Sequence, residues 1–451
     1  MTTALDSAIF GPLFTDAELA SLFTDDAYVE ALIEVEVALA RAEARLGIIP
    51  SAAAEQIATT VTANKPDIAM LAQGTVRSGF PIIALVQELR RIVGTEAGPY
   101  LHWAATTQDI MDTAFVLQLR SAIKLFKDRI GQLSRHLSEL AERHRGAVMA
   151  ARTHGQQALP LSFGLKAAAW LAPLIRHAQR LSEISPRLLL VQFGGAAGTL
   201  AALGDEGDGV TKALAEELGL GAPLMPWHAQ RDSFAEFAAW LSLLTGTLGK
   251  MAQDILLLAQ TEVGEAAETA DEGRGGSSTM PQKSNPITSE LIIAAARTNA
   301  ALLSAMHNAQ IQEHERATHG WQVEWLTLPQ MVMLTGGALK HALYLAKNLQ
   351  VDDGRMRENI ARGNDLILAE AAVFALAKAM PRVQAEALVK KACGIAASNR
   401  KGLVGVLREL AEDAVPQGVV DWSRLGDPAN YLGETEKIIE RVRESAKKIL
   451  G

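Results

Sequence analysis

Residues 113–144 of the chain read TAFVLQLRSAIKLFKDRIGQLSRHLSELAERH. From residue 123 onward, apolar side chains recur at spacings of three and four, at Ile123, Phe126, Ile130, Leu133, Leu137 and Leu140. This is the spacing of a helix that buries one seam, so it predicts a single helix over 113–144. At 1.5 Å per residue such a helix is roughly 45 Å long, which is more than one chain's core usually requires.

Four more long, proline-poor segments follow this helix, at 161–184, 230–267, 286–310 and 322–349. With the first helix they predict an elongated bundle, whose surplus apolar surface favours oligomerisation. Shorter helices are expected on both sides, including one at 24–46 with acidic residues between its apolar ones. We therefore expect an all-α fold of three helical domains, with an N-terminal domain at 1–112, a central long-helix bundle at 113–364 and a C-terminal domain at 365–451.

Composition supports helices and excludes several classes of protein. The chain has 451 residues, 49% of them hydrophobic but only 5% aromatic, and Ala and Leu, which favour helices, recur throughout. The net charge of −8 and the absence of basic runs argue against a nucleic-acid partner. The single cysteine, Cys393, fits a reducing compartment. With no signal-peptide pattern and no long apolar run, we expect a cytoplasmic protein without a membrane partner.

Three stretches resemble cofactor-binding motifs, but each lacks a feature that its motif requires. Residues 188–198 look like a strand and a glycine turn but lack the G-x-G-x-x-G order of a dinucleotide site. Residues 275–284 lack the glycine that precedes the lysine of a phosphate loop, because Gln282 stands there. His314 and His319 are five residues apart and do not share a helix face as zinc ligands do. We therefore expect neither a metal nor an organic cofactor.

Three polar segments interrupt the helical sequence and are the candidate site. The first, residues 105–113, places Thr107 and Gln108 just before the seam helix. Hydroxyl and amide groups at a helix entrance suit a carboxylate, because free N–H groups and the helix dipole face it. Ordinary N-capping by Thr or Asp is the alternative interpretation.

The second segment, residues 151–160, places Arg152, Thr153 and His154 just before two glutamines, between two expected helices. An imidazole moves protons near neutral pH, so His154 is a candidate acid or base, or else a histidine satisfied within a loop. The third segment, residues 273–286, is a glycine-rich loop that contains Ser277, Lys283 and Asn285. Such a loop either closes over a ligand or is simply solvated.

Together these segments resemble the three signature regions of the fumarase/aspartase superfamily. The third region, GSSTMPQKSNP at 276–286, is nearly the whole superfamily signature. Within the superfamily the chain is most similar to the bacterial cycloisomerase branch, on the stretches TTQDIMDTAFVLQLR (106–120), LVQFGGAAGTLAALG (190–204), PWHAQRD (226–232), QEHERATHGWQVEWLTLP (312–329) and DPANYLG (427–433). The resemblance implies an all-α homotetramer in which each active site takes one region from each of three subunits.

The resemblance also implies roles for single residues. Ser277 matches the loop serine that serves as the base next to a carboxylate, and His154 matches the histidine of the T-H-x-Q segment. Substrate binding is implied for Lys283, Asn285, Thr107 and Gln108. Some members of the branch lack this histidine and carry one three positions later, where this chain has Gln157.

The reaction implied is closure of a muconate with three carboxylates to a lactone. A small-molecule tricarboxylate requires cations, and Arg is suited to bidentate carboxylate binding. The candidate cations are Arg77, Arg152, Arg231 and Arg316, with Thr153 and His102 as further substrate contacts. If His154 is not the proton donor, His102, His314 or His319 is the next candidate. The alternatives are a lyase that releases fumarate from adenylosuccinate or argininosuccinate, a sulfomuconate cycloisomerase, and a non-catalytic helical tetramer.

Overall fold

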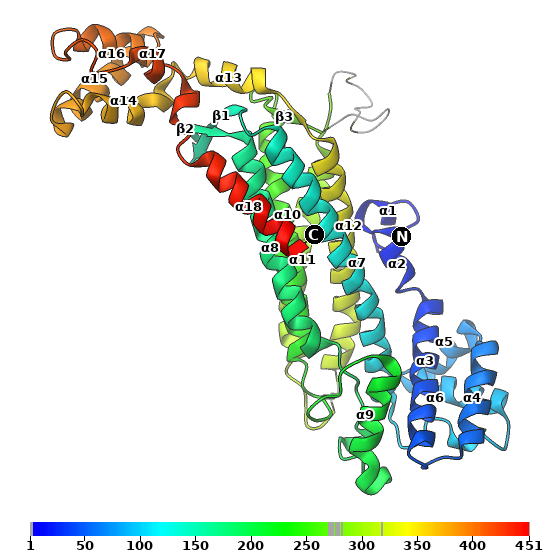
Figure 1. The fold of residues 1–451 in the computed structure, drawn as a ribbon. Coiled ribbons are helices and arrows are strands. Elements are labelled where there is room, and N and C mark those ends of the chain that lie inside the picture. The colour runs from blue at the N-terminus through cyan, green and yellow to red at the C-terminus, as the bar shows by residue number, and fades with distance from the viewer. Residues whose placement is uncertain (1–2, 269–274, 276–279, 281–282, 317–318, 451) are drawn as a thin grey trace. The chain divides into compact units, whose positions relative to one another are not determined.

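The computed structural model describes residues 3–268, 275, 280, 283–316 and 319–450 (Figure 1). Its α-helices are α1 Gly11–Phe14, α2 Ala17–Ser21, α3 Asp25–Arg45, α4 Ser51–Ala63, α5 Ile68–Ser78, α6 Ile82–Val93, α7 Thr107–Arg143, α8 Phe163–Leu188, α9 Gly207–Leu218, α10 Asp232–Leu258, α11 Ile287–Ala309, α12 Gly320–Asn348, α13 Asp353–Arg362, α14 Ala369–Leu376, α15 Arg382–Asn399, α16 Leu403–Ala411, α17 Trp422–Leu425 and α18 Thr435–Leu450. Short 3-10 helices lie at η1 Gly98–Tyr100, η2 Gly195–Ala197, η3 Ala201–Glu206, η4 Leu366–Leu368 and η5 Pro428–Tyr431. The strands are β1 Val148–Thr153, β2 Gln156–Ser162, β3 Ala266–Ala267 and β4 Gln350–Val351.

The predicted long helices are present, and the all-α fold class is confirmed. The seam helix is α7, which begins at Thr107 rather than at 113 and ends at Arg143. All six predicted seam side chains are at most 3% exposed. The other four long segments correspond to α8, α10, α11 and α12. No described helix combines the length and the apolar character needed to cross a bilayer.

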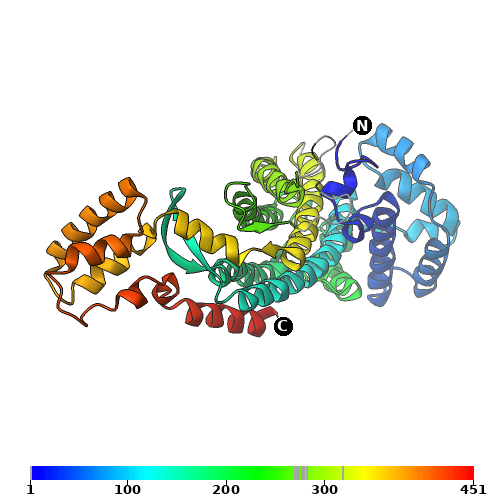
Figure 2. The ribbon, with the colours of Figure 1, turned by 90° about the horizontal axis from the view of Figure 1, so that it is seen from above.

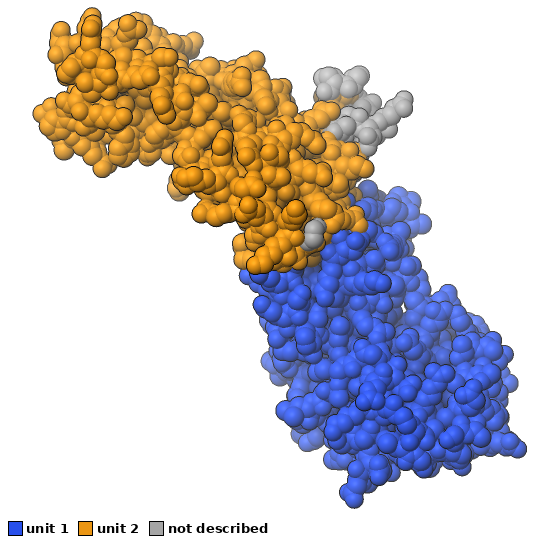
Figure 3. Space-filling view, viewed as in Figure 1, with its two compact units in different colours: residues 1–129, 177–246, 294–340 blue, residues 130–176, 247–293, 341–451 orange. Residues whose placement is uncertain are grey.

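The described residues form two compact units, coloured separately in Figure 3. Unit 1 contains 1–129, 177–246 and 294–340, and unit 2 contains 130–176, 247–293 and 341–451. The boundaries cut through α7, α8, α10, α11 and α12, so each long helix contributes residues to both units. The division into three domains stays a prediction.

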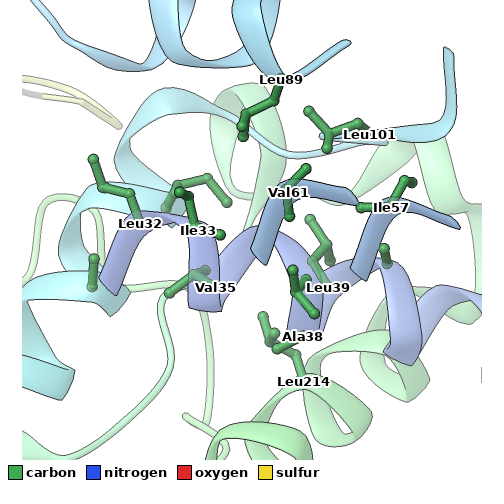
Figure 4. Close-up of a cluster of buried hydrophobic side chains, with 14 of the residues drawn as sticks. Leu32, Ile33, Val35, Ala38, Leu39, Ile57, Val61, Leu89, Leu101 and Leu214 are labelled. Atoms are coloured by element: carbon green, nitrogen blue, oxygen red, sulfur yellow. The ribbon is translucent and has the colours of Figure 1, made fainter. Parts of the chain in front are cut away.

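The N-terminal helices of unit 1 pack around α3. Thr24 caps this helix, because its hydroxyl accepts a hydrogen bond from the Ala27 amide at 3.2 Å. Both ribbon views show α3, α4 and α6 lying side by side (Figures 1 and 2). Their apolar side chains, including Leu32, Ile57 and Leu89, meet in one buried cluster (Figure 4).

Two acidic residues of α3 depart from the expected amphipathic pattern. Glu36 is 1% exposed and Glu43 is 0% exposed. They are seven residues apart, which is two helical turns, and therefore share the buried face. Periodicity alone does not reveal this, because a carboxyl group is normally assigned to the solvent side.

In unit 2, the second polar segment forms a feature that the helical reading missed. Strands β1 and β2 pair as an antiparallel hairpin, with Thr153 opposite Gln156. The turn residues His154 and Gly155 have φ angles of +51° and +76°. Positive φ at both central positions is typical of the two-residue turns that suit hairpin twist. The two strands, VMAART and QQALPLS, do not alternate polar and apolar residues regularly, so the pattern that indicates a strand is missing from the sequence.

Candidate active site

The first polar segment builds the N-terminus of α7 in unit 1. The backbone N–H of Thr106 donates to Oδ2 of Asp109 at 2.9 Å, and the Asp109 N–H donates to the Thr106 carbonyl at 3.0 Å. The Asp109 carboxylate thus makes one half of a capping box, the bond back to the N–H of the cap residue. The other half is absent, because the Thr106 hydroxyl accepts from Arg316 and not from the Asp109 N–H. Capping by an Asp side chain, the alternative interpretation of this segment, is therefore present at Asp109.

Asp109 does more than cap the helix. Its carboxylate is 1% exposed and also accepts from the backbone N–H groups of Gly194 (3.0 Å) and Gly195 (2.9 Å). Gln192 Nε2 lies 3.3 Å and His228 Nε2 lies 2.7 Å from Oδ1. A buried carboxylate is stable only when its oxygens are hydrogen-bonded, and Asp109 meets this condition with donors from three segments.

Gly194 has to be glycine for this packing. A Cβ atom there would lie 2.6 Å from the Pro226 Cβ atom and 2.8 Å from the His228 Cε1 atom. Both distances are shorter than real Cβ contacts, so any side chain at this position would have to displace Pro226 and His228. The glycine turn that imitates a dinucleotide motif is thus a position where the side chains of Pro226 and His228 approach the backbone closely.

One turn further along α7, Asp112 faces a buried cation. Arg231 is 2% exposed, and its Nη1 atom donates to Asp112 Oδ2 at 2.6 Å while its Nε atom donates to Glu324 Oε1 at 2.9 Å. Trp321 Nε1 donates to Asp112 Oδ1 at 2.9 Å. The guanidinium carbon lies 4.7 Å from the ring centroid of Phe234.

The pKa directions follow from this geometry. Burial lowers the pKa of the Arg231 guanidinium, but the carboxylates of Asp112 and Glu324 outweigh it and raise that pKa above its usual range. Burial raises the pKa of the Glu324 carboxyl, and the opposing effect of Arg231 is smaller. Arg231, a sequence candidate for substrate binding, is therefore engaged inside the protein.

Gln108 and Thr107 lie at the same helix end. Gln108 is 1% exposed, and its Nε2 group donates to Asp112 Oδ2 at 3.2 Å and to the His228 carbonyl at 2.9 Å. Both amide hydrogens are thus used within the chain. Thr107 is half-buried in the first position of α7.

Three further candidates lie in unit 1. Arg316 Nη1 donates to the Thr106 hydroxyl at 2.9 Å, so the structure brings this cation to the first polar segment. His102 Nδ1 lies 2.7 Å from Glu36 Oε1. Burial lowers the pKa of His102, but Glu36 and Asp109 more than compensate, so the net direction is upward. Arg77 is exposed in the last turn of α5.

Beside Asp112 and Arg231, unit 1 contains a cavity of about 490 Å³. Aromatic side chains, including Phe115 and Trp325, line much of it. The charged residues in its described lining are Asp25, Asp112, Glu324 and Arg231. Because acidic groups outnumber the one cation, this cavity does not favour a trianion.

The second and third segments place their candidates in unit 2. Arg152 forms a bidentate pair with Glu265, with its Nη1 and Nη2 atoms 2.8 Å and 2.6 Å from the two carboxylate oxygens. Asn359 Nδ2 also donates to the fully buried Glu265 at 2.8 Å. Thr153 and His154 are exposed at the hairpin turn.

In the third segment, the structure describes the two candidates that follow the serine. Lys283 is exposed and Asn285 is half-buried. The backbone N–H of Asn285 donates to the Gly275 carbonyl at 2.9 Å, and Gly275 has a φ of +72°. Ser277 lies outside the described residues. Gln157, three positions after His154, donates from Nε2 to the Asn359 carbonyl at 3.0 Å.

The alternative histidines are placed differently. His314 and His319 are both exposed, and His319 Nε2 lies 3.0 Å from Glu313. Within the described ranges no group of three or more His, Cys, Asp or Glu side chains is arranged to hold a metal ion.

Sequence reasoning missed several residues that shape the site. Asp109, His228 and Glu324 were not candidates, although each lies inside a stretch that carried the resemblance. The available signal was the pair of acids three residues apart at the start of α7, which places two carboxylates on one helix face. Their partners are 85 and 119 residues away in the chain, so no local pattern reveals them.

Comparisons with known proteins identify the family of the chain. A family model described as Lyase matches residues 15–298. The chain is 44% identical over 436 residues to 3-carboxy-cis,cis-muconate cycloisomerase of Pseudomonas aeruginosa, which covers 96% of this chain and 95% of the relative. The crystal structure of fumarate lyase from Mesorhizobium sp. BNC1 has a TM-score of 0.90 at 44% identity, covering 96% of this chain and 98% of that one.

A second solved structure is similar over the whole chain. The crystal structure of 3-carboxy-cis,cis-muconate lactonizing enzyme from Pseudomonas putida has a TM-score of 0.92 at 39% identity, covering 99% of this chain and 100% of that one. The family match and these full-length similarities confirm the resemblance read from the three polar segments. The chain belongs to the Lyase family, within the fumarase/aspartase superfamily.

Proposed function

We propose that the protein is a cycloisomerase that closes 3-carboxy-cis,cis-muconate to its carboxymuconolactone, a step in the breakdown of aromatic compounds. The observation that carries the proposal is the 44% identity with the Pseudomonas aeruginosa cycloisomerase over 436 residues. The presence of Ser277, His154 and Lys283 argues against a non-catalytic relative.

The reaction needs no external nucleophile. One carboxylate oxygen of the substrate adds to a ring-closing carbon of a double bond, forming the C–O bond of the lactone. The electron pair of that double bond moves toward the neighbouring carboxylate and gives an aci-carboxylate. The carbon next to this carboxylate then takes up a proton. Holding the internal nucleophile in place and stabilising the developing charge are the main contributions of the protein.

Substrate binding is assigned to several of the candidate residues. In unit 1 these are Thr107 and Arg316 near the start of α7, with His102 and Arg77. In unit 2 they are Lys283, Asn285, Thr153 and Arg152. Gln108 belongs to this group only if its amide gives up one of its internal hydrogen bonds. Arg152, already paired with Glu265, contributes its remaining N–H groups and a fixed position.

Proton transfer is assigned to Ser277 and His154. In the reverse direction Ser277 removes the proton from the carbon next to the carboxylate. In the lactonising direction it therefore donates a proton to that same carbon. A serine oxyanion requires hydrogen-bond donors that lower the pKa of its hydroxyl. His154, on the exposed hairpin turn, donates or relays the proton.

We further propose a cytoplasmic homotetramer whose active sites are shared between subunits. Exposed apolar side chains on the long helices support association, among them Leu243 and Leu257 on α10 and Leu326 on α12, which are 53%, 48% and 69% exposed. Exposure of His154 and Lys283 is consistent with candidate groups that meet a neighbouring subunit.

The direct test is to mix the purified protein with 3-carboxy-cis,cis-muconate in deuterated water and identify the product by NMR. We expect a lactone with one deuterium at the carbon next to the carboxylate. Ser277→Ala is expected to lower kcat by orders of magnitude while the oligomer stays intact. Near-normal turnover by this variant would remove Ser277 from the chemistry, and an unchanged substrate in the wild-type reaction would refute the proposed function.

A second candidate is a lyase that releases fumarate from a succinyl compound. The observation that favours it is the 44% identity with the Mesorhizobium fumarate lyase, as high as that with the cycloisomerase. Fumarate among the products of adenylosuccinate or argininosuccinate would support this alternative.

A further inference from the structure

We infer that His228 is a positioning residue for the proposed reaction, which holds the start of α7 where Thr107 meets a substrate carboxylate. The inference rests on the proposed function, because it assigns Thr107 to the substrate. It gives a role to two stretches, 190–195 and 226–231, that carried the family resemblance but hold none of the groups assigned to the chemistry.

Both stretches lie against the first two turns of α7. The Thr113 hydroxyl donates to the Gln192 carbonyl at 3.0 Å and accepts from the Gln192 N–H at 2.8 Å. The Gln192 side chain links the stretches to each other, because its Oε1 atom accepts from the Trp227 N–H at 2.8 Å. The two segments therefore form one hydrogen-bonded clamp on α7.

His228 is the residue of the clamp that contacts two consecutive positions of the first turn. Its Nε2 atom lies 2.7 Å from Asp109 Oδ1, and its carbonyl accepts from Gln108 Nε2 at 2.9 Å. Thr107 immediately precedes these two residues. Any shift of Gln108 and Asp109 is therefore transmitted to Thr107 through a rigid helical turn.

The burial of His228 decides between a positioning and a catalytic role. The side chain is 3% exposed, and its nearest polar partner is a carboxylate that is 1% exposed. It therefore does not touch the substrate. Without the His228 N–H, the Asp109 carboxylate lacks one hydrogen bond in a site that excludes water. The carboxylate can find another donor only by changing its position. Sub-ångström displacement of a binding group is enough to weaken productive binding.

The experiment compares His228→Phe with His228→Gln by steady-state kinetics on 3-carboxy-cis,cis-muconate. Phe keeps the bulk and removes the donor, whereas the Gln amide nitrogen takes the place of Nε2. We expect His228→Phe to raise KM by roughly tenfold or more with a smaller change in kcat, because a carboxylate contact acts on ground state and transition state alike. His228→Gln should restore KM to within about threefold of the wild type.

Asn299→Val is the matched control for a purely structural loss. Asn299 is 0% exposed and its Nδ2 group donates to the Thr335 hydroxyl at 3.0 Å, between α11 and α12. This variant should lower Tm as His228→Phe does and leave KM unchanged. Gln192→Met removes the hydrogen bonds of the Gln192 side chain but keeps His228, so its KM should lie between those of the wild type and His228→Phe. This variant replaces His228→Phe in the test if His228→Phe does not fold.

The outcomes separate this inference from the proposed function. If the wild type makes the lactone and both His228→Phe and Gln192→Met keep the wild-type KM, the inference is wrong and the proposed function stands. If His228→Gln fails to restore KM, the donor to Asp109 is not the cause. If the wild type makes no lactone, the proposed function fails before any variant is compared.

Discussion

Unit 1 stabilises the buried acidic side chains at the start of α7 and those on α3 in opposite ways. At the start of α7, the Asp109 carboxylate has five hydrogen-bond donors, from Thr106, Gln192, Gly194, Gly195 and His228. On α3, neither oxygen of Glu43 has a hydrogen-bond partner among the described residues. Both side chains are at most 1% exposed, so the difference lies in their partners and not in their depth.

The difference shows in the charge each region holds. Burial, together with the nearby Glu36, raises the pKa of Glu43 to about 9, so this carboxyl group is protonated at neutral pH. Around Asp112, by contrast, a buried cation is retained between two carboxylates. The region that the proposed function uses is held by directional charged contacts, whereas α3 tolerates an acid by keeping it neutral.

The largest effect is expected from removing the cation of the α7 region. Arg231→Leu leaves Asp112 and Glu324 buried without their partner, and breaking a buried pair in this way costs about 3–5 kcal/mol. Urea denaturation of the variant measures this loss. Adding Asp112→Asn and Glu324→Gln should recover part of it, because the unpaired charges are then gone. A single variant as stable as the wild type would contradict the role of these ion pairs.

A smaller and opposite effect is expected on α3. Because the folded-state pKa of Glu43 is raised to about 9, the folded chain keeps a proton that the unfolded chain releases above its ordinary glutamate pKa. Stability attributable to this group therefore falls as pH rises between those two values. Glu43→Gln removes this titration. Its stability relative to the wild type should therefore be about 1–3 kcal/mol greater at pH 8 than at pH 5.

The measurement for Glu43→Gln is the urea midpoint at both pH values. Glu34→Gln is the control, since Glu34 lies on the same helix with its side chain 54% exposed. It should shift neither midpoint. Equal stability of Glu43→Gln and wild type at both pH values would show that Glu43 is ionised or solvated in the folded state.

The smallest effect concerns the His102–Glu36 pair. Because the pKa of His102 is raised overall, the pair contributes stability below the ordinary histidine pKa and loses it as pH rises through the raised value. Glu36→Gln should therefore destabilise the protein by about 1 kcal/mol near pH 5.5 and by less near pH 8.5. Thermal unfolding at the two pH values checks the sign, and a larger loss at the higher pH would refute it.

Much of the helical framework was predictable, because the apolar spacing of α7 survives in the structure from Ile123 to Leu140. The start of α7 was placed six residues late because Asp109 and Asp112, polar in sequence, are buried there. The hairpin around His154 is not predicted, because neither of its strands alternates polar and apolar residues regularly. Glu265, the partner of Arg152, is 113 residues away, so only the folded chain reveals that pair.

The central claim is that the three polar segments serve a tricarboxylate muconate. The most direct measurement is kcat/KM of one preparation on 3-carboxy-cis,cis-muconate and on adenylosuccinate, with both products identified. The account predicts lactone formation with kcat/KM at least about a hundredfold above any release of fumarate. Faster release of fumarate than formation of lactone would contradict it.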